Sequence, residues 1–266
     1  MTPPMPIAAT VAGSDSGGGA GIQADLKSFA AAGVYGVSVL VALTAQNTLG
    51  VEAVHAVPAD FVVAQLAALD RDLRPVAVKT GMLLSAELIE VVAEQISQRG
   101  WGPLVVDPVM VAKGGDRLLR AEAVDTLRDR LLPLAEVLTP NWPEAATLAE
   151  MEIVDERTAL AAGRRLLEMG PRWVLVKGGH SPDEPNDLLI GREQVVLLRG
   201  TRVLGPHTHG TGCTFSAALT AHLARGRSVP EAAAEAKRYL QAALEQAPKL
   251  GGGHGPLQHL PKGWPE

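Results

Sequence analysis

The stretch HTHGTGCTFSAAL, residues 207–219, holds the only cysteine of the chain, Cys213, between a glycine-rich turn and the predicted start of a helix. A single cysteine cannot form an internal disulfide, so a disulfide-stapled secreted scaffold is excluded. Two interpretations of the thiol remain open at this point. It can be a small buried hydrophobic group, or a reactive group, because a helix N-terminus lowers a thiol pKa from its usual value of ~8.5.

The composition of the rest of the chain narrows the function classes. The 266 residues are 47% hydrophobic and carry a formal net charge of -5, which suits one large α/β domain or two small ones. Mild acidity without basic clusters argues against nucleic acid as a partner. No apolar run approaches the ~20 residues that span a bilayer, and the N-terminus lacks the pattern of a signal peptide. We therefore expect a soluble, cytoplasmic protein with no membrane partner.

Short apolar runs alternate with helix-patterned segments along the whole chain. The predicted strands are 7–13, 37–43, 76–81, 103–108, 135–140 and 173–179. The predicted helices include 61–73, 86–100, 158–170, 211–225 and 230–246. Continuous apolar strands are typical of a parallel sheet covered on both faces, and the alternation predicts a doubly wound α/β fold with helices on both faces.

The segment NDLLIGREQVVLLRG, residues 186–200, interrupts this alternation. Two apolar runs flank GREQ, a pattern that predicts a short antiparallel hairpin at the edge of the sheet. No linker, repeat or low-complexity stretch divides the chain. We therefore expect one domain over residues 1–266.

Polar side chains follow nearly every predicted strand. They include Asp15, Asp25, Gln46, Asn47, Asp107, Asn141, Glu144 and Lys177, and glycine clusters follow the first strand and the hairpin. Ligands of open parallel sheets bind beyond the carboxyl ends of the strands, so these groups should converge. Glycines before a helix leave backbone N–H groups free for an anion. Carboxylates beside an anion site indicate Mg²⁺ and a nucleotide, and therefore phosphoryl transfer.

Taken singly, these residues also have structural interpretations. Asp107 and Glu144 could cap the helices that follow them, and Lys177 could be a solvated loop lysine. The loop histidines could satisfy backbone groups; only His209 lies close to the thiol in the sequence. The histidines show no zinc-site spacing. The joint pattern is what favours a site.

Two nucleotide-binding motifs are absent in their usual form. Gly19-x-Gly21-x-x-Ala24 loosely matches the dinucleotide fingerprint, but the second strand ends in LTAQNT, where an acidic residue for the ribose is expected. A nicotinamide-dependent dehydrogenase is therefore disfavoured. No glycine loop ends in Gly-Lys-Ser/Thr, so a Walker A motif is also missing.

The opening stretch resembles the G-x-G-D anion-hole motif of the ribokinase-like kinases, with cysteine in place of aspartate. Further blocks are similar to those of the hydroxymethylpyrimidine/phosphomethylpyrimidine kinases of thiamine biosynthesis, in the same order from about residue 7 to GHGPLQHL. They read AGSDSGGGAGIQADLKSF, ALTAQNTLGV, KTGML, DPVMVAKGG, TPNWPEA and VKGGH. The resemblance implies a ribokinase-like domain, a homodimer, and ATP-dependent phosphorylation of 4-amino-5-hydroxymethyl-2-methylpyrimidine to its monophosphate and then to its diphosphate.

The resemblance also implies roles for individual residues. Cys213 corresponds to the general base toward the substrate hydroxyl, and the backbone amides of Gly210, Thr211, Gly212 and Cys213 to the anion hole. Lys177 would neutralise phosphate charge, and Lys177, Asn141 and Gly212 would bind the nucleotide. Asp107 and Glu144 would hold Mg²⁺. The substrate pocket would comprise Gln46, Asp25, Met82 and Val109.

Two other interpretations compete with this one. A pyridoxal or pyridoxine kinase of vitamin B6 salvage has the same fold and an equally flat heteroaromatic alcohol as substrate. The amide of Gln46 favours the aminopyrimidine, whose edge both donates and accepts hydrogen bonds. A ligand-binding protein without catalysis would be expected to have lost the anion hole, the acids or the lysine, and all three are present.

Overall fold

The computed structural model describes residues 4–111, 115, 122–181 and 184–264. Residues 112–114 of the DPVMVAKGG block lie outside this description. Nine strands form one sheet in the order β3-β2-β1-β4-β5-β6-β7-β8-β9. The strands are β1 Ile7–Gly13, β2 Tyr35–Gln46, β3 Val51–Ala56, β4 Ala77–Thr80, β5 Leu104–Val106, β6 Val137–Leu138, β7 Trp173–Val176, β8 Asp187–Ile190 and β9 Val195–Leu198.

The sheet is parallel from β2 to β7 and antiparallel at both edges. The predicted hairpin is confirmed as β8 and β9, with β8 also antiparallel to β7. At the opposite edge β3 pairs antiparallel with β2. The apolar pattern did not predict β3, because its sequence VEAVHA lies on an exposed edge and buries almost nothing.

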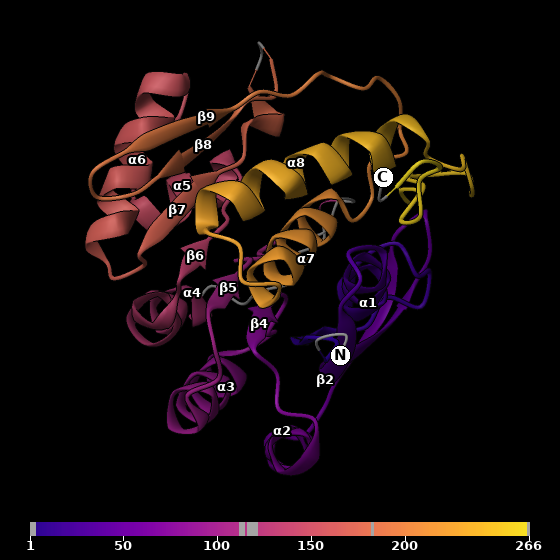
Figure 1. Ribbon diagram of the computed structural model, residues 1–266, viewed down its shortest axis with the longest axis vertical. Helices are drawn as coiled ribbons and strands as arrows, with labels where there is room; N and C mark the ends of the chain where they lie inside the picture. The colour runs from indigo at the N-terminus through magenta and orange to yellow at the C-terminus, as the bar shows by residue number, and fades with distance from the viewer. Residues whose placement is uncertain (1–3, 112–114, 116–121, 182–183, 265–266) are drawn as a thin grey trace.

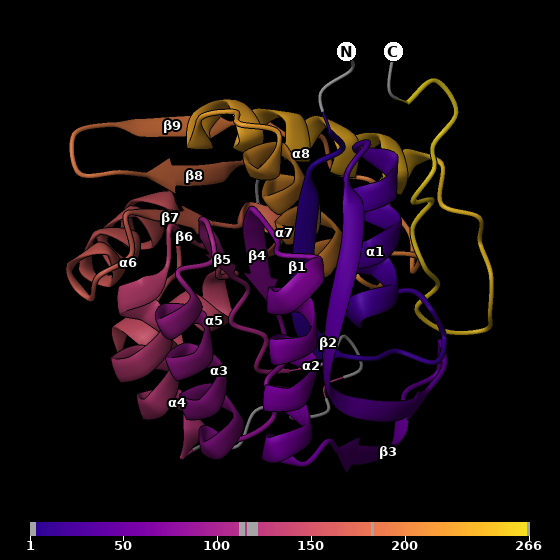
Figure 2. The same cartoon turned by 60° about the horizontal axis from the view of Figure 1, so that its bottom comes forward.

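Helices cover both faces of the sheet, as expected (Figures 1 and 2). The longer ones are α1 Gly21–Ala31, α2 Ala59–Asp72, α3 Ala86–Arg99, α5 Trp142–Ala149, α6 Glu156–Glu168, α7 Thr211–Ala224 and α8 Val229–Glu245. The short α4, Ala123–Thr126, continues into further helical turns up to Leu134. Side chains of α2, α3, α5 and α6 pack on one face of the sheet, and those of α1, α7 and α8 on the other.

Helix α7 is apolar on nearly every side because it lies between the sheet and α8 (Figure 1). Its N-terminus lies at the edge of the sheet where β1, β4, β5 and β7 end. Gly210 precedes the helix with φ +80°, and a Cβ there would lie 1.8 Å from the carbonyl oxygen of Gly19. Glycine is therefore required to bring the two glycine-rich loops together.

Among the described residues, none of the helices combines the length and apolar character that crossing a membrane requires.

Candidate active site

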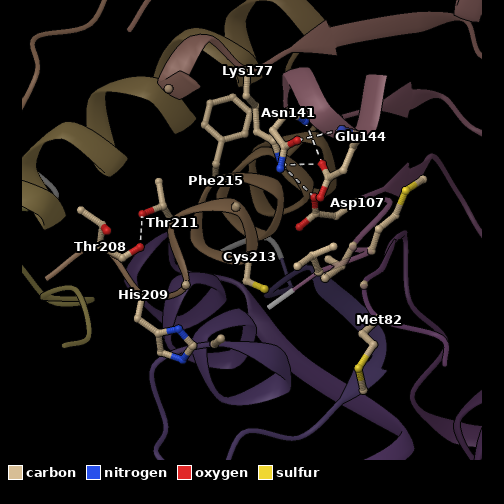
Figure 3. Close-up of a pocket in the computed structure, with 18 of the residues that line it drawn as sticks. Met82, Asp107, Asn141, Glu144, Lys177, Thr208, His209, Thr211, Cys213 and Phe215 are labelled. Carbon is tan, nitrogen blue, oxygen red and sulfur yellow. Dashed lines mark hydrogen bonds and ion pairs between the residues drawn. The ribbon is translucent and has the colours of Figure 1, made fainter. Parts of the chain in front are cut away.

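A cavity of about 1000 Å³ opens at the carboxyl ends of the parallel strands. It is lined by eleven of the twelve predicted site residues: Gln46, Met82, Asp107, Val109, Asn141, Glu144, Lys177, Gly210, Thr211, Gly212 and Cys213. Figure 3 shows the thiol of Cys213 on one side of Lys177 and the two acids, with Met82 further along the wall. Residues from six separate segments therefore meet in one place, as the position of each behind a strand predicted.

The twelfth predicted residue, Asp25, does not line the cavity. Its side chain is fully buried and forms a bidentate ion pair with Lys79, with Nζ–O distances of 2.7 and 2.8 Å. Thr10 donates a further hydrogen bond to it at 2.6 Å. Asp25 thus lies behind the cavity wall, while Lys79, in the middle of β4, reaches the lining.

Lys177, directly after β7, lies between the two acids. Its Nζ is 3.0 Å from Asp107 Oδ1 and 3.9 Å from Glu144 Oε2. Burial alone would raise the pKa of Asp107, but the ammonium groups of Lys177 and Lys79 hold that pKa below its usual value. Asp107 is therefore a carboxylate at neutral pH.

Glu144 caps the helix that follows it, which is one of the two interpretations that the sequence left open. It completes a capping box at the start of α5: Asn141 N–H donates to Glu144 Oε2 at 2.8 Å, and Glu144 N–H donates to Asn141 Oδ1 at 2.9 Å. Its side chain also faces the cavity. Burial, reinforced by the charge of Asp107 and opposed by Lys177, raises the pKa of Glu144 to about 7. A bound cation would shift it to the ionised form.

Gly212 leaves room beside the charged cluster. A Cβ built on it would lie 3.2 Å from Lys177 Nζ and 3.6 Å from Asp107 Oδ2. The first N–H groups of α7 have no acceptor within the helix and point toward this end of the cavity. Together with Lys177 they form a positively polarised pocket that can hold an anion.

Cys213 is a half-buried residue in the first turn of α7. Burial raises its pKa to about 11, although the charge of Lys79 and the N–H of Gly21 favour the thiolate. This is the reverse of the lowering expected from the helix N-terminus. The negative charges of Asp25 and Asp107 also act against thiolate formation.

At the other end of the cavity, Asp15 joins the two glycine-rich loops. Its carboxylate accepts hydrogen bonds from the N–H groups of Gly17, Gly19 and Ala20, at 2.8 to 3.1 Å. It also lies 2.8 Å from Nε2 of His209. Despite its burial, these donors and the imidazole lower the pKa of Asp15.

The sequence predictions missed three contributors to the site and singled out a fourth, His209, only for its closeness to the thiol in the sequence. Ser216 donates to Asp107 Oδ2 at 3.1 Å, and it lies one helical turn beyond Gly212. Lys79 is a charged residue inside an apolar strand, a pattern that indicates a buried partner. Thr44 and His209 contact the side chain of Gln46. Thr44 could have been found because it precedes Gln46 by two residues and shares its face of β2.

The sequence and the architecture match known proteins over nearly the whole chain. The family model described as phosphomethylpyrimidine kinase matches residues 15–258. The hydroxymethylpyrimidine/phosphomethylpyrimidine kinase of Haemophilus influenzae is 48% identical over 94% of this chain and 95% of its own.

Two solved structures show the same likeness. The phosphomethylpyrimidine kinase of Clostridium difficile is 41% identical with a TM-score of 0.80, over 89% of this chain and 98% of that one. The pyridoxal kinase of Bacillus subtilis, solved as an ADP complex, is 38% identical with a TM-score of 0.90, over 96% and 98%. These findings confirm the predicted ribokinase-like fold class, and the chain belongs to the phosphomethylpyrimidine kinase family.

Proposed function

We propose that the chain transfers the γ-phosphoryl group of ATP to the hydroxymethyl oxygen of 4-amino-5-hydroxymethyl-2-methylpyrimidine, and then phosphorylates the monophosphate to the diphosphate. The observation that carries this proposal is the convergence of Lys177, Asp107, Glu144 and the N-terminus of α7 in one cavity. Family membership supplies the substrate class. Gln46, Met82 and Val109, which line the same cavity, would contact the pyrimidine.

The residues present also fit a magnesium ion. Mg²⁺ keeps several waters and binds through one or two carboxylates plus substrate phosphates. Asp107 and Glu144 supply two carboxylates beside the room above Gly212, and no group of three or more candidate ligands occurs in the described part of the chain. Asp107 and Glu144 would hold the ion, which would supply positive charge to offset that of the phosphate groups.

In this mechanism the chain acts through charge and position. Lys177 and the N–H groups at residues 211–213 stabilise the negative charge of the transferring phosphoryl group, which is carried on its equatorial oxygens. Because the transition state is loose, the attacking hydroxyl needs little help from a base. The protonated thiol of Cys213 can hold that hydroxyl by a hydrogen bond, and its minor thiolate form can accept the proton.

Other properties follow from the family likeness and belong to the proposal. We expect a single domain over residues 1–266, a homodimer, a cytoplasmic location, and small molecules rather than nucleic acid as partners. Light scattering of the purified chain tests the dimer.

The test of the main proposal is to supply ATP, Mg²⁺ and the aminopyrimidine alcohol and to look for both phosphates by mass. Pyridoxal kinase is the second candidate, favoured by the likeness to the Bacillus subtilis enzyme. Turnover of pyridoxal is therefore measured beside that of the pyrimidine. A higher kcat/KM for pyridoxal, with no pyrimidine diphosphate, would assign the chain to the second activity.

A further inference from the structure

The side-chain amide of Gln46 has two polar neighbours inside the cavity. Thr44 Oγ1 lies 3.2 Å from the Gln46 atom placed as Oε1. His209 Nε2 lies 3.3 Å from the Gln46 atom placed as Nε2. Turning the amide by 180° interchanges its oxygen and nitrogen without changing its shape. The hydrogen-bond capacities of the neighbours therefore decide its orientation.

His209 cannot accept a hydrogen bond from Gln46 through Nε2. Its Nε2 lies 2.8 Å from Oδ2 of Asp15, a carboxylate that accepts from three backbone N–H groups as well. A carboxylate has only acceptors, so the hydrogen between these atoms belongs to the imidazole. Nε2 thus carries its one proton toward Asp15 and has no lone pair to offer an amide N–H. The group of Gln46 that can face this N–H is therefore the carbonyl oxygen, as the longer, second acceptor of a shared hydrogen bond.

The position of the imidazole is itself fixed. A Cβ added to Gly19 would lie 2.6 Å from Cδ2 of His209, so the glycine loop packs directly on the ring. The main chain of His209 is also held, because its backbone N–H donates to the carbonyl oxygen of Gly255 at 3.1 Å. The histidine is buried and cannot easily turn away.

Thr44 requires the same orientation of the amide for an independent reason. Its hydroxyl hydrogen is donated to the carbonyl oxygen of Ser14 at 2.9 Å, and a backbone carbonyl can only accept. The hydroxyl oxygen then offers Gln46 only lone pairs. The amide nitrogen is therefore the group that faces Thr44.

With both neighbours satisfied, the amide keeps one N–H and one carbonyl lone pair for the cavity. They lie side by side on its free edge, the acceptor on the side of His209 and the donor on the side of Thr44. This edge matches an aminopyrimidine, in which an exocyclic amine donates next to a ring nitrogen that accepts. The reversed amide would set donor against donor.

We propose that Thr44 and the Asp15–His209 pair are positioning residues that fix the orientation of the Gln46 amide, and thereby make the site select a heteroaromatic alcohol with an amine next to a ring nitrogen. This inference rests on the proposed function for the identity of the substrate class. It assigns specificity to residues behind Gln46 in addition to Gln46 itself.

The experiment compares two alcohols, 4-amino-5-hydroxymethyl-2-methylpyrimidine and its analogue without the amine. Wild-type protein should prefer the amino compound in kcat/KM by about tenfold or more. Thr44→Val keeps the shape of the side chain and removes the hydroxyl, so this preference should fall several-fold, mainly through KM. Thr44→Ser keeps a hydroxyl at this position and should therefore keep the wild-type preference.

The same comparison applies to His209. His209→Leu should lower the preference, and His209→Gln should retain it because a glutamine N–H can replace Nε2–H toward Asp15. Ser16→Ala is the matched control: Ser16 bonds only the backbone of Gln46, with its hydroxyl on the carbonyl oxygen at 2.6 Å. Ser16→Ala should change kcat/KM for both alcohols by the same factor, so that the preference stays as in the wild type. Thermal unfolding shows that each variant is folded.

The outcomes separate the two proposals. If wild-type protein phosphorylates neither alcohol, the proposed function fails. If it phosphorylates them without discrimination, or if Thr44→Val and His209→Leu both keep the wild-type preference, the function stands and the positioning role is refuted.

Discussion

At the scale of single residues, we expect Lys177 to contribute more to catalysis than Cys213. It contacts Asp107 and Glu144 and lies beside the room above Gly212, whereas the thiol is mostly protonated at neutral pH. We predict that Lys177→Ala lowers kcat by about 100-fold or more, since it removes charge stabilisation of the transition state. Cys213→Ala should lower kcat by the same factor or less. Steady-state kinetics of the two variants test this, and inactivation by Cys213→Ala alone would contradict it.

The thiol itself gives a direct measurement, because no other cysteine is present. Burial raises the pKa of Cys213 to about 11, so the thiolate fraction should grow about tenfold for each pH unit up to pH 9. The rate of alkylation by iodoacetamide, followed by mass, should rise with the same slope. A plateau below pH 8 would show that the thiol is activated in the free protein.

At the scale of elements, helix α5 links stability to the site. Its capping box joins Asn141 and Glu144, so Asn141→Ala should cost about 1 kcal/mol of unfolding free energy and also lower kcat. The capping box of α6, which joins Asp155 and Thr158, provides the matched control away from the cavity. Asp155→Ala should lower the melting temperature without changing kcat. Equal activity in the two variants would show that the cap of α5 has no catalytic importance.

At the scale of the whole molecule, the buried imidazole of His222 in α7 destabilises the folded protein. The side chain is 3% exposed, and neither ring nitrogen has a hydrogen-bond partner within the described structure. Burial, with the nearby Arg227, lowers its pKa from 6.5 to about 4. Its folded-state pKa lies below the unfolded value, so stability is highest above pH 6.5 and falls as pH drops toward 4.

Replacement of this histidine tests the point. His222→Leu should raise the free energy of unfolding by about 1–3 kcal/mol at pH 7.5, because an unsatisfied polar ring is removed from the core. The gain should be larger at pH 5, where the wild type must keep the ring uncharged against its unfolded-state preference. Urea unfolding at the two pH values measures both effects. A gain that shrinks at pH 5 would contradict the assignment.

The parallel sheet was predictable because its strands are continuous apolar runs, and β1, α3 and α7 follow the expected ranges closely. Edge strand β3 was not, since an exposed strand has no apolar pattern to reveal it. Among site residues, Asp107 and Lys177 follow strands directly and were predictable. Asp25 was misplaced because its partner, Lys79, is 54 residues away in the chain.

The order of polar groups behind apolar strands was a property of the sequence by itself, since parallel strands bring their carboxyl ends to one edge whatever the details of packing. Tertiary structure alone decided which groups are charged and which way they face. The pKa of Cys213, the burial of Asp25 and the orientation of the Gln46 amide depend on neighbours that lie far away in the chain. Electrostatic and hydrogen-bond energies act across space, and no local pattern encodes those distances.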